Sequence, residues 1–282
     1  METLLFFFIL SGAFCHVAWN ILLKNSIDKI LFTRSFTLIG SIILLPLLFF
    51  IEPLPRSAYP YLFLTLFIHV FYKFFLCKTY DNSGLSYGYP IARGSPSLII
   101  LFLTPYFLDQ ELNIQNKFSI IVLCAGILLL IFSEGKFKKI NFKGLSYSLL
   151  VALTITLYTI VDSLGARASN VVSYLFTYFI LDGFAFNLMS FVFLKKSYLT
   201  FNFIKNHFNS IFFASILSIY SYFPAVYGFS VSNVASVAAL REVSILFASI
   251  YGVFFLKEKM GLVGFFSSLL IFAGAFLIKV FG

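Results

Sequence analysis

The chain has 282 residues, of which 60% are hydrophobic and only 11% are charged, and its mean hydropathy is +0.97. A water-soluble fold of this length cannot bury so much apolar surface, so the composition excludes a soluble protein and predicts an all-α integral membrane protein. The formal net charge of +9 would suggest a nucleic-acid partner in a soluble protein. Here the lysines lie in short gaps between apolar runs, so we read them as topology signals and expect a lipid bilayer, and no nucleic acid, around the chain.

Ten apolar runs of the length needed to cross a bilayer, about 20 residues each, follow one another along the chain. The first starts almost at the first residue, without a basic segment before it or a small-residue cleavage site after it, so we expect it to be retained as a span. The gaps between runs are too short for a soluble domain, so any function must reside in the membrane. The runs are predicted at 2–23, 30–51, 59–80, 86–108, 117–133, 144–165, 170–194, 208–229, 232–255 and 261–281.

The two halves of the chain resemble each other. The segment SYGYPIARGSPSLIILF around Arg93 aligns with VASVAALREVSILFASI around Arg241 at an offset of 148 residues, and an Ala-Gly pair near the end of each half follows the same offset. We therefore predict two five-helix repeats, over 1–136 and 142–282. Because five is odd, the second repeat must enter the membrane from the opposite side, and such inverted repeats are typical of alternating-access carriers.

Polar residues recur on single helix faces inside the apolar runs. An ionisable side chain at membrane depth costs about 2.5 to 3.5 kcal/mol even on lenient scales, so each needs a partner or a water-filled cavity. Residues four apart share one face of a helix, and we predict that these faces converge on a central polar cavity. The stripes are His16 and Asn20 with Trp19 beside them; Thr65, His69 and Lys73; Tyr89, Arg93 and Ser97; Thr154, Tyr158 and Asp162; and Tyr174, Tyr178 and Asp182.

Arg241 and Glu242 are consecutive, and neighbours on a helix diverge by about 100°. At least one of them must therefore find another partner. Our hypothesis is that Arg93 and Arg241 line the cavity and meet Asp162 and Glu242, or an anionic group of a solute. The alternative is a buried ion-pair network that only fixes helix packing. The candidate binding residues are His16, Trp19, Asn20, His69, Tyr72, Tyr89, Arg93, Tyr158, Asp162, Tyr222, Arg241 and Glu242.

Four segments resemble the EamA-type branch of the drug/metabolite transporter superfamily: HVAWNILLKNS (16–26), LSYGYPIARGSPSLIILF (85–102), TLYTIVDSLGARAS (156–169) and VASVAALREVSILFASIYGVFFLKEKMG (234–261). The resemblance covers essentially the whole chain, in order. It implies a ten-helix carrier of two EamA-like repeats that moves small organic solutes, often outward, through a cavity between the repeats. It also implies a multi-pass protein of the inner (plasma) membrane.

We predict a secondary transporter, in the direction of export, of small organic metabolites such as amino acids or related anionic or zwitterionic solutes. Two arginines and two histidines at membrane depth favour such solutes. Buried carboxylates leave proton or counter-substrate coupling open, and the alternatives are a lipid-linked sugar flippase, a cationic drug efflux carrier and a non-transporting assembly subunit. We find no HExxH, HxxxxD or GxSxG motif and no paired Cys/His ligands, so we expect no enzyme activity, no metal and no cofactor.

The orientation in the membrane stays open from sequence. On the N-terminal side the gaps hold four Lys or Arg residues and on the other side twelve, which by the positive-inside rule would place both termini outside. The family resemblance implies cytoplasmic termini instead. The sequence also leaves the oligomeric state open, with a homodimer as one alternative.

Overall fold

The computed structural model describes residues 1–82, 85–133, 141–194, 201–255 and 261–281, apart from the side chains of residues 85–91, 130–133, 193–194, 201 and 252. All regular structure in the described part is helical, as predicted. The first half contains α1 (Thr3–Asn25), α2 (Lys29–Leu44), η1 (Leu45–Phe49), η2 (Arg56–Ala58), α3 (Tyr59–Asn82), α4 (Leu85–Leu108) and α5 (Ile114–Ser133). The second half contains α6 (Phe142–Arg167), α7 (Val171–Leu194), α8 (Phe201–Asn206), α9 (Phe208–Val231), α10 (Val234–Arg241), α11 (Ser244–Phe255) and α12 (Leu262–Phe281).

Eight segments among the described residues are helical, long and apolar enough to cross a membrane. They correspond to α1, α2 with η1, η2 with α3, α6, α7, α9, α10 with α11, and α12. The two other predicted runs, at 86–108 and 117–133, coincide with α4 and α5. The prediction of a multi-pass helical membrane protein is therefore confirmed.

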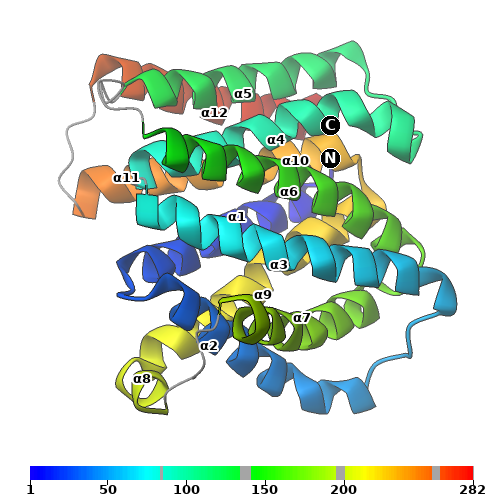
Figure 1. Cartoon of the computed structure of the whole chain (residues 1–282). Helices are drawn as coiled ribbons and strands as arrows, with labels where there is room; N and C mark the ends of the chain where they lie inside the picture. The colour runs from blue at the N-terminus through cyan, green and yellow to red at the C-terminus, as the bar shows by residue number, and fades with distance from the viewer. Residues whose placement is uncertain (83–84, 134–140, 195–200, 256–260, 282) are drawn as a thin grey trace.

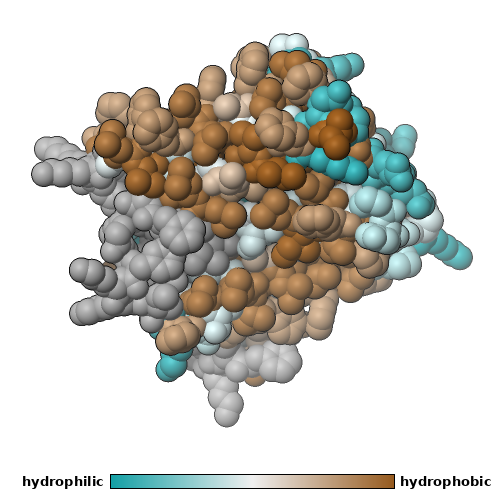
Figure 2. Space-filling view, turned by 90° about the horizontal axis from the view of Figure 1, so that it is seen from above, coloured by the Kyte–Doolittle hydropathy of each residue, from teal (hydrophilic) through white to brown (hydrophobic). Residues whose placement is uncertain are grey.

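The outer surface of the bundle is apolar. On α12, the side chains of Phe265, Phe266, Phe272 and Phe276 are each more than half exposed. Figure 2 shows a face on which hydrophobic side chains cover most of the described surface, with hydrophilic ones gathered toward one edge. Side chains of this kind suit contact with lipid tails rather than with water.

The helices pack in pairs that join the two halves of the chain. The main pairs are α5 with α12, α3 with α6, α1 with α9, α4 with α6, and α2 with α7. Figure 1 shows α5 and α12 side by side, with the two chain ends close together, where the Lys279 ammonium donates to the Met1 carbonyl at 2.8 Å. The predicted spans can be matched in order, so that α1 corresponds to α6, α2 to α7, α3 to α9 and α5 to α12. With this matching, the α3–α6 contact corresponds to the α1–α9 contact, and the α5–α12 and α2–α7 contacts each join a span to its own counterpart.

Two glycines let α5 and α12 approach closely. A Cβ atom at Gly126 would lie 2.8 Å from the Ile271 nitrogen, and one at Gly274 would lie 2.6 Å from the Leu123 nitrogen. These contacts are with backbone, which cannot move aside as the tip of a side chain can. Small residues at such crossings are the usual device by which membrane helices gain close packing. They are also the two glycines that the self-comparison of the sequence aligned.

The run predicted as one span at 232–255 is divided into α10 and α11. The division lies at Glu242 and Val243, whose N–H groups donate three residues back, to Ala239 at 3.0 Å and Leu240 at 3.1 Å. This is the tighter 3₁₀ pattern, in which side-chain directions change relative to an α-helix. No proline or glycine stands there, so local sequence gave no signal for the break. The break places Arg241 at the last position of α10.

Candidate functional site

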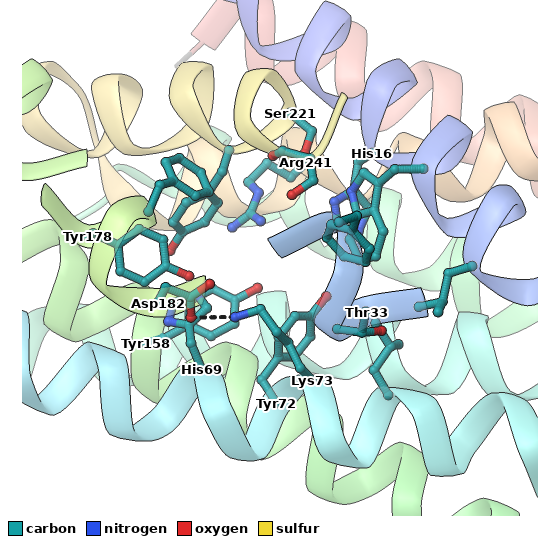
Figure 3. Close-up of a pocket in the computed structure, with 17 residues that line it drawn as sticks. His16, Thr33, His69, Tyr72, Lys73, Tyr158, Tyr178, Asp182, Ser221 and Arg241 are labelled. Atoms are coloured by element: carbon teal, nitrogen blue, oxygen red, sulfur yellow. Dashed lines mark hydrogen bonds and ion pairs between the residues drawn. The ribbon is translucent and has the colours of Figure 1, made fainter. Parts of the chain in front are cut away.

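A cavity lies among seven helices from both halves of the chain. It encloses about 530 Å³ of space between atoms, counted with the open space at its edge. Figure 3 shows its labelled side chains arranged around this space, with Arg241 reaching in from the side opposite Lys73 and Tyr72. The lining residues are His16, Trp19 and Leu23 of α1; Thr33 and Phe36 of α2; His69, Tyr72, Lys73 and Leu76 of α3; Tyr158 of α6; Tyr178, Phe179 and Asp182 of α7; Ser218, Ser221 and Tyr222 of α9; and Arg241 of α10.

The structure brings seven of the twelve sequence-predicted residues to this cavity. They are His16, Trp19, His69, Tyr72, Tyr158, Tyr222 and Arg241. Four others, Asn20, Arg93, Asp162 and Glu242, are buried but do not line it. The side chain of Tyr89 lies outside the described residues.

Arg241 is the cation of the cavity that has no carboxylate partner within the described part of the chain. Its side chain is buried, with 5% of the residue exposed. The guanidinium carbon lies 5.2 Å from the centre of the Tyr222 ring and 5.8 Å from that of Phe229. Both distances allow cation–π attraction, which holds the group without occupying its N–H donors. Those donors are therefore available to a solute.

Asp162 lies one layer behind the cavity wall. Its carboxylate accepts hydrogen bonds from the hydroxyl of Tyr174 at 2.8 Å and from the hydroxyl of Tyr222. Since Tyr222 lines the cavity and also lies under Arg241, one tyrosine contacts both charged groups. Asp162 thus acts on the cavity through Tyr222 rather than by direct exposure.

A second pair of charges lies within the lining itself. The Lys73 ammonium on α3 forms a buried ion pair and hydrogen bond with the Asp182 carboxylate on α7, drawn as a dashed line in Figure 3. Lys73 also lies 5.8 Å from the centre of the Phe186 ring. The pair joins a helix of the first half to a helix of the second and leaves no net charge at this side of the cavity.

Four tyrosines surround the imidazole of His69. The ring is stacked on Tyr158 with centroids 4.2 Å apart, and it lies 4.8 Å from Tyr178, 5.5 Å from Tyr222 and 6.0 Å from Tyr72. Its Nδ1 is hydrogen-bonded within α3, to Thr65 at 3.0 Å. The result is an aromatic wall contributed by four helices, which can stack against an organic solute.

The ion pair between Arg93 and Glu242 joins α4 to the break after α10. The Arg93 Nε lies 3.1 Å from a Glu242 carboxylate oxygen, and both side chains are 3% exposed. Glu242 therefore turns away from Arg241, as the divergence of consecutive residues requires, and finds its partner on another helix. Asn20 also has its hydrogen-bonding partners within the protein: it donates to the His16 carbonyl at 2.7 Å and accepts from the Tyr80 hydroxyl at 2.7 Å. Like Arg93 and Glu242, it therefore connects parts of the bundle and does not line the cavity.

The candidate residues named from sequence omitted several that line the cavity. Lys73, Tyr178 and Asp182 stood on the predicted polar stripes and were left out of the candidates, while Thr33, Phe36, Phe179, Ser218 and Ser221 carried no signal of their own. The cross-helix pair of Lys73 and Asp182 could have been proposed from charge complementarity alone. The remaining residues are of types that occur throughout the spans, so only packing selects them.

Comparisons with known proteins bear on the fold and the family. A solved crystal structure matches with a TM-score of 0.73 over 99% of this chain and 96% of that chain, at 14% sequence identity, which shows a shared fold and no more. No curated protein matches the sequence. Residues 142–280 match the model of the EamA-like transporter family. The second half of the chain therefore matches the EamA-like transporter family, a family of the drug/metabolite transporter superfamily.

Proposed function

We propose that the protein is a secondary transporter that exports small organic solutes bearing a carboxylate, such as amino acids or related anionic or zwitterionic metabolites. The observation that carries this proposal is Arg241, a buried guanidinium that lines the cavity with no carboxylate within 4 Å among the described residues. A planar guanidinium matches the geometry of a carboxylate and can bind it by two parallel hydrogen bonds. The aromatic wall around His69 then accommodates the organic part of the solute.

The charges around the cavity support a solute with one anionic group. Lys73 is paired with Asp182, and Arg93 with Glu242, so both pairs are neutral units. Of the charged groups that line the cavity in the described part of the chain, Arg241 remains for the solute. A phosphate ester carries two negative charges, and Arg241 would balance only one of them. Because an unbalanced charge at membrane depth is costly, such a solute is disfavoured.

We further propose that transport occurs by alternating access between two inverted repeats of five spans each, in the plasma membrane. The packing of the helices supports this proposal, because α3–α6 and α1–α9 would be equivalent contacts if the two halves are matched span by span. Two near-equivalent packings of one sequence plan give a cavity that can open to either side in turn. The cavity lies where helices of both halves meet, as such a mechanism requires.

The test is solute binding and flux with the purified protein. Thermal stabilisation is measured with L-alanine, L-phenylalanine, glycerol 3-phosphate, UDP-glucose and ethidium, and each stabilising solute is then followed by counterflow in proteoliposomes. We expect stabilisation and flux with an amino acid, and loss of both in Arg241→Gln. Lys117→Gln removes one positive charge from an exposed position at the start of α5 and is expected to behave as the native protein.

The other outcomes have distinct meanings. Stabilisation by ethidium alone would indicate a cationic drug carrier, and by UDP-glucose alone a carrier of nucleotide sugars. Binding of an amino acid that persists in Arg241→Gln would overturn the anchoring role of Arg241. Flux with none of these solutes would favour a lipid-linked substrate or a non-transporting subunit.

A further inference from the structure

Asp162 differs from the other buried carboxylates at the centre of the bundle. Asp182 and Glu242 each have a lysine or arginine within 4 Å, whereas Asp162, with 1% of the residue exposed, has none among the described residues. Its carboxylate is held by hydroxyl groups, those of Tyr174, Tyr222 and Thr65. Burial of a carboxylate at this depth without a neighbouring cation favours the uptake of a proton.

Tyr222 connects this carboxylate to the solute site. Its hydroxyl donates to Asp162 while the face of its ring lies 5.2 Å from the Arg241 guanidinium carbon. Arg241 therefore shares a contact residue with Asp162. Among the described residues, the titratable and charged groups around the cavity and Asp162 are His16 of α1; His69, Tyr72 and Lys73 of α3; Arg93 of α4; Tyr158 of α6; Tyr174, Tyr178 and Asp182 of α7; Tyr222 of α9; Arg241 of α10; and Glu242 directly after α10.

We propose that Asp162 is the proton-binding residue of the transporter, and that its proton and a solute carboxylate on Arg241 bind together. The second half of this proposal rests on the function proposed above, and the first half does not. Before binding, Arg241 and Asp162 balance each other. A carboxylate on Arg241 adds one negative charge, and a proton on Asp162 cancels it, so the loaded cavity is again neutral.

The direction of the coupling follows from the charges. A solute carboxylate on Arg241 offsets the positive charge that stabilises ionised Asp162, so it raises the affinity of Asp162 for a proton. By linkage, protonated Asp162 raises the affinity of Arg241 for the carboxylate by the same factor. With one proton bound per solute, the apparent Kd of the solute falls by about tenfold for each unit of decreasing pH while Asp162 is ionised in the free protein. Export is then driven by the outward gradient of the solute, which leaves together with a proton.

Tyr222 is a positioning residue in this step. While Asp162 is ionised, the Tyr222 hydroxyl donates to it. When the same carboxylate oxygen takes a proton from a hydronium ion, an O–H bond of the hydronium breaks, a water molecule is released, and the new O–H of Asp162 can donate to the Tyr222 oxygen. The Tyr222 proton is then released to point toward the cavity, which adds a donor for an anionic solute.

The closing experiment needs no solute. Infrared spectra of the native protein in nanodiscs are recorded against pH, and the C=O stretching band of a protonated carboxyl is followed. We expect a band that appears as the pH falls, disappears in Asp162→Asn and moves its titration midpoint to higher pH in Arg241→Gln, which removes the stabilising cation. Lys117→Gln is the matched loss of one positive charge and is expected to leave the midpoint in place.

Further variants keep the proposal open to refutation. If Asp162→Asn does not fold, Tyr222→Phe, which removes one hydroxyl donor, is expected to raise the same midpoint. His69→Gln is expected to retain the band, since the imidazole is not its source. A band that survives in Asp162→Asn, or a midpoint equal in Arg241→Gln and the native protein, would overturn the proposal. Either result is distinct from a failure to find transported solutes, which would leave the titrating band intact.

Discussion

The ion pair between Arg93 and Glu242 allows a quantitative test of whether a buried charge is structural. The two charged groups are 3.1 Å apart and each side chain is 3% exposed. At an effective dielectric constant of about 20, unit charges at this separation attract by about 5 kcal/mol. Removal of one partner from a buried pair costs about 3 to 5 kcal/mol, whereas replacement of both by apolar residues of similar size is often neutral or stabilising. We therefore expect Arg93→Met and Glu242→Met each to destabilise the protein strongly, and the double variant to be more stable than either.

The assay is thermal unfolding in detergent with a thiol-reactive fluorescent dye. Cys77 and Cys124 are buried, at 0% and 1% exposure, so their reaction with the dye reports unfolding. A loss of about 3 to 5 kcal/mol corresponds to a fall in apparent Tm on the order of 10 °C for a chain of this size. Because neither residue lines the cavity, the folded double variant should bind solute with native affinity. Additive losses in the double variant would refute the reasoning, since the pair would then contribute no interaction of its own.

Three further predictions use the same preparations. Gly274→Val is expected to lower the free energy of unfolding by about 1 to 3 kcal/mol, because a Cβ atom there would lie 2.6 Å from the Leu123 nitrogen. Gly261→Val is the control in the thermal assay, because a Cβ atom at Gly261 would meet no atom within 4 Å. Asn233→Ala removes the side-chain oxygen that accepts from two N–H groups at the start of α10 and should cost about 1 kcal/mol, so an unchanged Tm would count against a role for this cap. In proteoliposomes, solute flux should carry protons in the native protein but not in Asp162→Asn, as read by a pH-sensitive dye sealed inside; equal proton movement in both would contradict the coupling.

The features that the sequence determined depend on local composition. A charged fraction of 11% and apolar runs of span length require a helical membrane protein, because each backbone polar group in lipid must be satisfied within its own helix. The same cost singled out the ionisable residues at membrane depth as candidates. The divergence of Arg241 from Glu242 also followed from helix geometry, and it correctly required another partner for at least one of them.

Tertiary structure alone decided which of these residues meet. The polar stripes indicated which faces turn inward, but not which stripes meet across the bundle. For this reason the pairing of Lys73 with Asp182 was not predicted. For the same reason the sequence could not decide whether Arg93 and Glu242 line the cavity or pair with each other outside it. The break after Arg241, which has no proline or glycine to announce it, turns that arginine to the cavity and its neighbour to α4. Arg241 and Arg93 are the same residue type, and only their positions in the assembled bundle differ: Arg241 lines the cavity, whereas Arg93 is paired with Glu242.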